Sequence, residues 1–75
     1  MENSRPLDAL NKSRNKRVIV ELKNGKTFNG NLTAFDIHIN LYLDDATEIE
    51  NGEVKRKLGT LFLRGDAIIL VSPAE

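Results

Sequence analysis

The alternation of apolar and polar residues is the feature that most limits what this chain can fold into. Val18, Val20 and Leu22 fall on one face of the first alternating run. Successive side chains of a strand point to opposite faces of a sheet, so a period of two predicts strands with one buried face. The dipeptides Asn24-Gly25 and Asn51-Gly52 are those that a tight type I′ hairpin turn prefers. The sequence therefore predicts an antiparallel sheet built from hairpins.

Turn signals divide the chain after residue 17 into five strands, but one boundary stays open. The alternation continues from Phe35 to Asp44, so periodicity alone draws one long strand where a loop could interrupt it. Gly30 lies inside the second strand and predicts a bulge or sharp bend, which a small curved sheet needs in order to close on itself. Pro73 is expected to end the pairing of the last strand.

Pro6, Leu7 and Leu10 predict a short helix over about residues 6–13. Proline is favoured in the first turn of a helix, and the two leucines form a narrow apolar stripe. A helix this short is not stable alone, so we expect it to pack against the sheet. The expected fold class is mostly all-β: one domain over residues 1–75, with a short N-terminal helix and a strongly bent five-stranded antiparallel sheet or small open barrel.

With 75 residues the chain can enclose only one small core, which leaves a stability margin of roughly 3 to 5 kcal/mol. Small domains are usually reinforced by disulfides, a metal or association with other subunits. The chain has no cysteine and a single histidine, which excludes disulfides and makes a His/Cys metal site very hard to build. Association is the reinforcement that remains, and we expect no cofactor.

No apolar run approaches the ~20 residues needed to cross a bilayer, and residues 1–15 lack the apolar core of a signal peptide. We therefore expect a soluble, cytoplasmic protein with no membrane partner. Eleven basic and eleven acidic residues give a formal net charge of +0, so no general basic field attracts nucleic acid from a distance. This balance argues against a nonspecific nucleic-acid coat, although not against a site where a few charges are focused.

Two polar segments, Asp36-Ile37-His38-Ile39-Asn40 and Leu63-Arg64-Gly65-Asp66, carry the side chains best suited to binding a ligand. They combine an imidazole, a carboxamide, a guanidinium and carboxylates. Such groups can stack on a flat base and hydrogen-bond its edge, which is how single-stranded RNA is usually read. Taken singly, a polar histidine is more often a surface residue and Arg-Gly-Asp a plain turn, so this interpretation depends on both segments together.

These segments, with Gly30, Phe35 and the following Leu41-Tyr42-Leu43-Asp44, closely resemble the two motifs of Sm and Sm-like proteins. The similarity covers nearly the whole chain, and the Arg5-Pro6-Leu7-Asp8 opening is typical of archaeal members. It implies the Sm fold, an SH3-like open barrel, in which residues 36–40 form a loop between the second and third strands. With that loop, the expected strands cover about residues 17–23, 26–35, 41–50, 54–63 and 67–72.

The resemblance also implies a ring. In this family, subunits join through the edges of the fourth and fifth strands, here residues 58–63 and 68–71, and archaeal relatives are usually homoheptamers. Such rings bind uridine-rich single-stranded RNA around the inner rim of a central pore. A sheet that is not fully closed leaves two edges with unpaired N–H and C=O groups, and a ring pairs both edges on every copy.

By position, the resemblance implies that His38 and Arg64 sandwich a uracil, while Asn40 bonds the base edge. Asp66, through its side chain or the backbone N–H at that turn, adds a second polar contact. The implied RNA-binding residues are His38, Asn40, Arg64 and Asp66, and the implied loop supports are Asp36 and Gly65.

The expected function is that of a non-catalytic RNA-binding ring, acting as a scaffold or chaperone in RNA metabolism. The alternative is a small-barrel protein-interaction or structural ring module that binds no RNA. An enzyme is not expected, because the chain has no nucleophile with a nearby base and no phosphate-cradling glycine loop.

Several other polar residues are interpreted as structural or surface residues, apart from the candidate site. Asp44-Asp45 is expected to be a solvated strand end, and Tyr42 a cross-strand packing residue. Lys16-Arg17 stands where relatives often carry proline and is expected only to loosen the entry to the first strand. The charged residues expected to form a solubilising hairpin tip are Glu48, Glu50, Glu53 and Lys55 to Lys57. The basic residues considered for a second RNA contact on the helix face are Arg5, Lys12, Arg14, Lys16 and Arg17.

Overall fold

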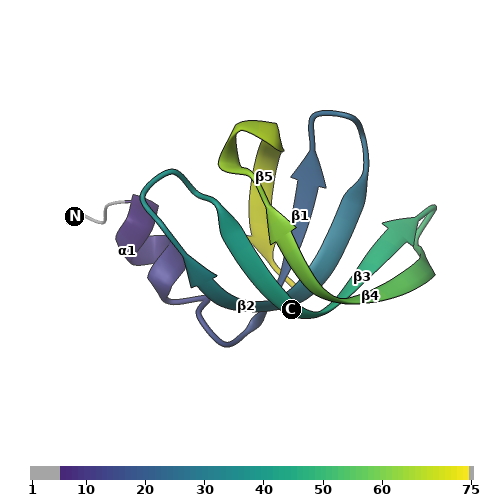
Figure 1. The fold of residues 1–75 in the computed structure, drawn as a ribbon, viewed down its shortest axis with the longest axis horizontal. Coiled ribbons are helices and arrows are strands. Elements are labelled where there is room, and N and C mark those ends of the chain that lie inside the picture. Colours follow the sequence, from purple (N-terminus) through teal and green to yellow (C-terminus); the bar gives the residue numbers. More distant parts are fainter. Residues whose placement is uncertain (1–5, 75) are drawn as a thin grey trace.

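The computed structural model describes residues 6–74, in which a short helix precedes five strands that form one bent antiparallel sheet (Figure 1). The elements are α1 (Pro6–Asn11), β1 (Arg17–Leu22), β2 (Thr27–Phe35), β3 (Leu41–Glu50), β4 (Glu53–Leu63), a 3-10 turn (Gly65–Ala67) and β5 (Ile68–Pro73). The strand order is β4-β3-β2-β1-β5, so β4 and β5 form the two edges. The expected fold class is confirmed. No helix in this part of the chain is long and apolar enough to cross a membrane.

The core lies on one face of the sheet, where the alternating apolar residues of β1, β2 and β3 meet. In β1 every second residue is buried, as the period of two predicts. Leu10 of α1 packs against this core from the N-terminal side. The buried apolar residues are Val18, Val20, Leu22, Phe28, Leu32, Leu41, Leu43, Ala46 and Leu63.

The sheet bends sharply at Gly30, and this confirms the bulge predicted there. The pairing of β2 with β3 shifts register between Asn29 and Asn31. A Cβ atom on Gly30 would lie 3.1 Å from the Ala46 Cα, and at the same distance from the Asp44 carbonyl oxygen and the Leu43 Cβ. Glycine therefore lets β3 approach β2 more closely than any other residue would.

The helix ends at Asn11, two residues before the predicted end near residue 13. The amides of Lys12, Ser13 and Arg14 donate to carbonyls three residues back, at 2.9–3.2 Å, which is the bonding of tight turns and not of an α-helix. Asn15, with a φ of 66°, then redirects the chain into β1. Figure 1 shows α1 at one end of the molecule and the tip of the β3–β4 hairpin at the other.

The two Asn-Gly hairpins differ from each other. Asn51 and Gly52 have φ values of 55° and 80°, as a type I′ turn requires. At the first hairpin only Gly25 has a positive φ, 88°, so the predicted type I′ turn is wrong there. The Asn24 side chain instead accepts a hydrogen bond from the Lys26 amide at 3.0 Å, which stabilises a different turn.

Two predictions for β3 are wrong. Asp44 and Asp45 lie inside the strand and not at its end, because β3 continues past an irregularity between Leu43 and Ala46. Glu48 is not part of a solvated tip: it is only 3% exposed. The period of two resumes after the irregularity and turns Glu48 toward the inner face with Ala46.

The buried Glu48 carboxylate is stabilised from β4. Its Oε1 accepts a hydrogen bond from Arg56 Nε at 2.8 Å, and Lys55 Nζ lies 4.0 Å from Oε2. The Arg56 hydrogen bond, together with the charges of Arg56 and Lys55, outweighs the opposing effect of burial and lowers the pKa of Glu48 from its ordinary value of 4.5.

We expect Glu48→Gln to lower the urea midpoint of unfolding at pH 7. A carboxyl whose pKa is lowered by folding stabilises the folded state above its unfolded pKa, near 4.5, and this contribution is lost as the pH falls through the folded pKa. The midpoints of the two proteins should therefore converge as the pH falls below 4.5 and through the lowered pKa of Glu48. Glu50→Gln, which removes an exposed carboxylate of the same hairpin, is the control and should change little. Equal midpoints for wild type and Glu48→Gln at pH 7 would contradict this account.

Candidate functional site

A loop over residues 36–40 separates β2 from β3, as the resemblance implied, and it interrupts the alternation that runs through this segment. The Ile39 amide donates to the Asp36 carbonyl at 3.0 Å, and the Asp36 amide donates to the Asn40 carbonyl at 3.3 Å. Ile39 has a φ of 61°, an uncommon and costly conformation for a β-branched residue. Other contacts must therefore hold the loop in this shape.

The Asp36 carboxylate supplies those contacts. Its Oδ1 accepts hydrogen bonds from the amides of His38, at 2.8 Å, and Asn40, at 3.2 Å. Its Oδ2 accepts from Asn40 Nδ2 at 3.1 Å. The Asn40 side-chain bond is the main reason why the pKa of Asp36 lies below its ordinary value of 3.8. The ionised carboxylate thus fixes both the loop and one side of the Asn40 carboxamide.

The other side of the Asn40 carboxamide joins the loop to the turn before β5. Its Oδ1 accepts a hydrogen bond from the Gly65 amide at 2.8 Å, across 25 residues of sequence. Because an amide N–H needs an oxygen acceptor, this bond fixes which atom of Asn40 faces which partner. Gly65 also presses against the loop: a Cβ there would overlap the His38 carbonyl oxygen. Glycine is the residue that this close approach permits.

The two polar segments share one open hollow of about 440 Å³. The guanidinium of Arg64 is 83% exposed and contacts the Asp66 carboxylate, with 3.1 Å between Nη2 and Oδ2. The hollow thus offers two planar groups, an imidazole and a guanidinium, beside an oriented amide. Its lining residues are His38, Asn40, Arg64, Gly65 and Asp66.

A second, mostly apolar hollow of about 320 Å³ adjoins the first and lies across the neighbouring ends of β2, β3 and β4. Tyr42 and Phe62 stack across β3 and β4, with ring centroids 4.8 Å apart and an interplanar angle of 18°. This confirms the packing role predicted for Tyr42. Phe62 is nevertheless 74% exposed, and on the opposite edge Ile69 and Leu70 of β5 are 58% and 42% exposed. Both edges of the sheet therefore present apolar side chains.

Two contacts around the site were not predicted from the sequence. The first is the bond from Gly65 to Asn40, although a glycine beside a polar motif is a known sign of close backbone approach. The second is the Arg14 guanidinium, which lies 5.7 Å from the centroid of the Phe35 ring, next to the loop. No sequence pattern signals this pair. Arg5, considered for a contact on the helix face, lies outside the described residues.

No group of three or more His, Cys, Asp or Glu residues within residues 6–74 is arranged to hold a metal ion. The side chains that line the first hollow can stack and form hydrogen bonds. The structure combines a short helix, a sharply bent five-stranded sheet with two edge strands, and two polar loops joined at one end. These features define the fold class as the Sm fold, a small open β-barrel.

The LSM domain family model matches residues 8–73, and the chain belongs to this family. The family consists of non-catalytic proteins, so the chain is not an enzyme. The snRNP Sm-like protein of Archaeoglobus fulgidus is 57% identical over 70 residues, which cover 93% of this chain and 91% of that protein.

Two solved structures extend the comparison. The Sm protein of Pyrococcus abyssi, in complex with a uridine heptamer, is 44% identical and superposes with a TM-score of 0.89 over 95% of this chain and all of the other. The SmAP1 heptamer of P. aerophilum is 36% identical, with a TM-score of 0.90 and 99% of each chain covered. Relatives of this chain thus form heptamers, and one of them binds a uridine oligomer.

We expect Gly65→Ala to displace the loop of residues 36–40 and to lower the free energy of unfolding by about 1–3 kcal/mol, because the added Cβ overlaps backbone atoms of the loop, which must shift. Urea unfolding measures the loss, and amide shifts in ¹H–¹⁵N spectra should move at His38 and Asn40. Gly52→Ala, at the distant hairpin, is the control and should leave those two amides unmoved. Unchanged shifts at both residues in Gly65→Ala would refute the contact.

Proposed function

We propose that this protein is a ring-forming scaffold or chaperone of RNA metabolism that binds uridine-rich single-stranded RNA around a central pore, in the cytoplasm. The observation that carries the proposal is the convergence of His38, Asn40, Arg64 and Asp66 on one hollow. The likeness to a relative in complex with a uridine heptamer supports it from a second direction.

The two sheet edges support the ring. Each edge strand pairs on one side only, so its other side offers unpaired N–H and C=O groups to a neighbour. The exposed Phe62 of β4, at the border of the apolar hollow, offers a surface of suitable chemistry for Ile69 and Leu70 of a second copy. A head-to-tail contact of this kind, from β4 to β5, closes into a ring when the rotation per subunit divides a full turn. The heptameric relatives favour seven subunits.

The hydrogen-bond donor and acceptor of the Asn40 carboxamide that remain free support uracil as the preferred base. One N–H of Nδ2 is engaged by Asp36, and one lone pair of Oδ1 is engaged by Gly65. A carboxamide in this state still has one donor and one acceptor free. Uracil can satisfy both groups at once, through a carbonyl oxygen and the ring N–H next to it. A slot between His38 and Arg64 would also favour a small base over a purine.

The proposed ring carries one hollow on each subunit, and the hollows together give the affinity for RNA that a single hollow lacks. Stacking contributes about 1–3 kcal/mol per base, so a single pocket binds weakly. Identical pockets on one ring engage successive bases of one strand, and each later contact benefits from a high effective concentration. The balanced net charge is compatible with this mode, because affinity comes from repeated local contacts.

Titration of the wild type with a fluorescent uridine heptamer should give binding at least tenfold tighter than with an adenosine heptamer of equal length. Arg64→Ala and Asn40→Ala should each weaken uridine binding by at least tenfold, because every pocket of the ring loses the same contact. Lys57→Ala, which removes a positive charge from the opposite hairpin, is the matched control. No binding at low salt would favour a protein-interaction module instead, and equal binding of both oligomers would refute the preference for uridine.

Ile69→Lys should convert the ring to monomers, because a charge replaces an exposed apolar side chain on the β5 edge. Native mass spectrometry measures this change, and uridine affinity should fall at least a hundredfold although every pocket residue is intact. Ile37→Lys is the control, since Ile37 is an exposed apolar residue of the loop and lies on neither edge strand. An intact Ile69→Lys ring would show that β5 is not an interface.

A further inference from the structure

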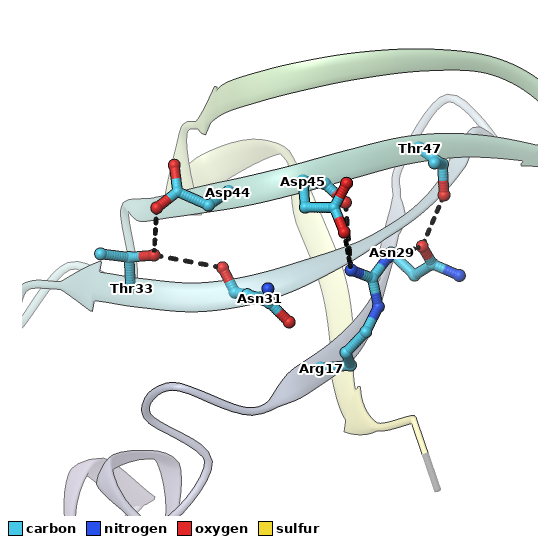
Figure 2. Close-up of polar contacts among 7 residues, drawn as sticks. All are labelled: Arg17, Asn29, Asn31, Thr33, Asp44, Asp45 and Thr47. Atoms are coloured by element: carbon cyan, nitrogen blue, oxygen red, sulfur yellow. Dashed lines mark hydrogen bonds and ion pairs between the residues drawn. The ribbon is translucent and has the colours of Figure 1, made fainter.

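On the face of the sheet opposite the core, Arg17 ties three strands together (Figure 2). It is the first residue of β1, and its Nη1 donates to the carbonyl oxygen and to the carboxylate Oδ2 of Asp45 in β3, each at 3.1 Å. Its Nη2 donates to Asn29 Oδ1 in β2, which lies between them, at 2.6 Å. We call this set of contacts, among Arg17, Asn29 and Asp45, the outer clamp.

The outer clamp acts at the point where the sheet bends. Asp45 has a φ of 51°, and the pairing of β3 with β4 shifts register between Leu43 and Ala46. The Thr47 hydroxyl donates to the same Asn29 oxygen at 2.5 Å, which fixes the strand on the far side of the irregularity. Gly30 permits the close approach of β2 and β3 on the buried face, and the clamp holds the same bend from the exposed face.

The expectation that Lys16-Arg17 only loosens the entry to β1 is therefore wrong. The Leu32 amide donates to the Lys16 carbonyl at 2.9 Å, and the Ala74 amide donates to the Arg17 carbonyl at 3.1 Å. The side chains of Arg17 and Asp45 are 38% and 81% exposed. Exposed ion pairs contribute little to the free energy of unfolding. The consequence of the clamp is thus geometric: it limits how far the bend can open or close.

The bend determines how the two edges face each other, because β4 and β5 lie at opposite ends of the strand order and the irregular part of β3 lies between them. In a closed ring each subunit turns by an equal share of a full rotation, about 60° for six members, 51° for seven and 45° for eight. Adjacent ring sizes therefore differ by only about 6–9° per subunit. A contact that restricts the bend by a few degrees is enough to choose between them.

We propose that the outer clamp selects a single ring size by fixing the angle between the β4 and β5 edges. This inference rests on the proposed ring. Arg17 and Asp45 are then determinants of assembly, although they lie on neither edge strand and do not line the hollow that contains His38 and Arg64.

Native mass spectrometry of the full chain tests the proposal. The wild type should give one ring mass, whereas Arg17→Met, which keeps an unbranched apolar stem and removes the donors, should give at least two ring masses separated by the 8.4 kDa of one subunit. Lys16→Met, which removes a positive charge one residue away, is the control and should match the wild type. Asn29→Ala is the second variant, because it removes the oxygen that accepts from both Arg17 and Thr47.

Far-UV circular dichroism and the urea midpoint establish that each variant is folded. If Arg17→Met does not fold, the result for Asn29→Ala decides. A single ring mass, equal to that of the wild type, in a folded clamp variant overturns the inference and leaves the proposed ring intact. A monomeric wild type overturns the proposed ring and this inference together. A second ring mass in the clamp variants and not in Lys16→Met supports the inference.

Discussion

The close approach of β2 and β3 at Gly30 is the constraint on which the rest of the structure depends. Gly30 has no Cβ, and a Cβ built there would lie only 3.1 Å from atoms of β3. The glycine therefore lets β3 pack closely against β2, and the sheet bends at this point. The bend wraps a small number of apolar side chains into a core. Because the bent sheet stays open, β4 and β5 remain its two edges. The core thus depends on the close approach that Gly30 permits.

The formal net charge of the chain is +0, but individual ionised groups have specific structural roles. The Asp36 carboxylate orients the side-chain amide of Asn40, and Glu48 is buried against Arg56 of β4. In both cases the carboxyl is more acidic in the folded protein than in the free amino acid, because donated hydrogen bonds favour the charged form. Local hydrogen bonding, and not the overall field of the protein, therefore determines the shape of the candidate site.

Much of this architecture could be predicted from the sequence, because a period of two and turn residues act over short distances. The inward face of β1 and the bend at Gly30 follow from such local rules. The end of β2 does not follow from such rules, because the alternation continues through the loop. Only the resemblance to the Sm family indicated that a loop begins there. Contacts between distant residues also escaped prediction: the Gly65–Asn40 bond and the bonds of Arg17 to β2 and β3 span up to 28 residues. Such pairs depend on strand order and register, which periodicity does not specify.

The unequal lengths of the two edge strands have a consequence for behaviour in concentrated solution. β4 has eleven residues and β5 has six, so a neighbour docked through β5 can cover only about half of β4. In the proposed ring, the half nearest the hairpin tip, Glu53 to Lys57, would then stay open. Open strands are sites where unrelated particles can adhere and grow into fibres. Here the exposed stretch carries charges of both signs, which oppose the addition of another strand and help to keep finished particles separate.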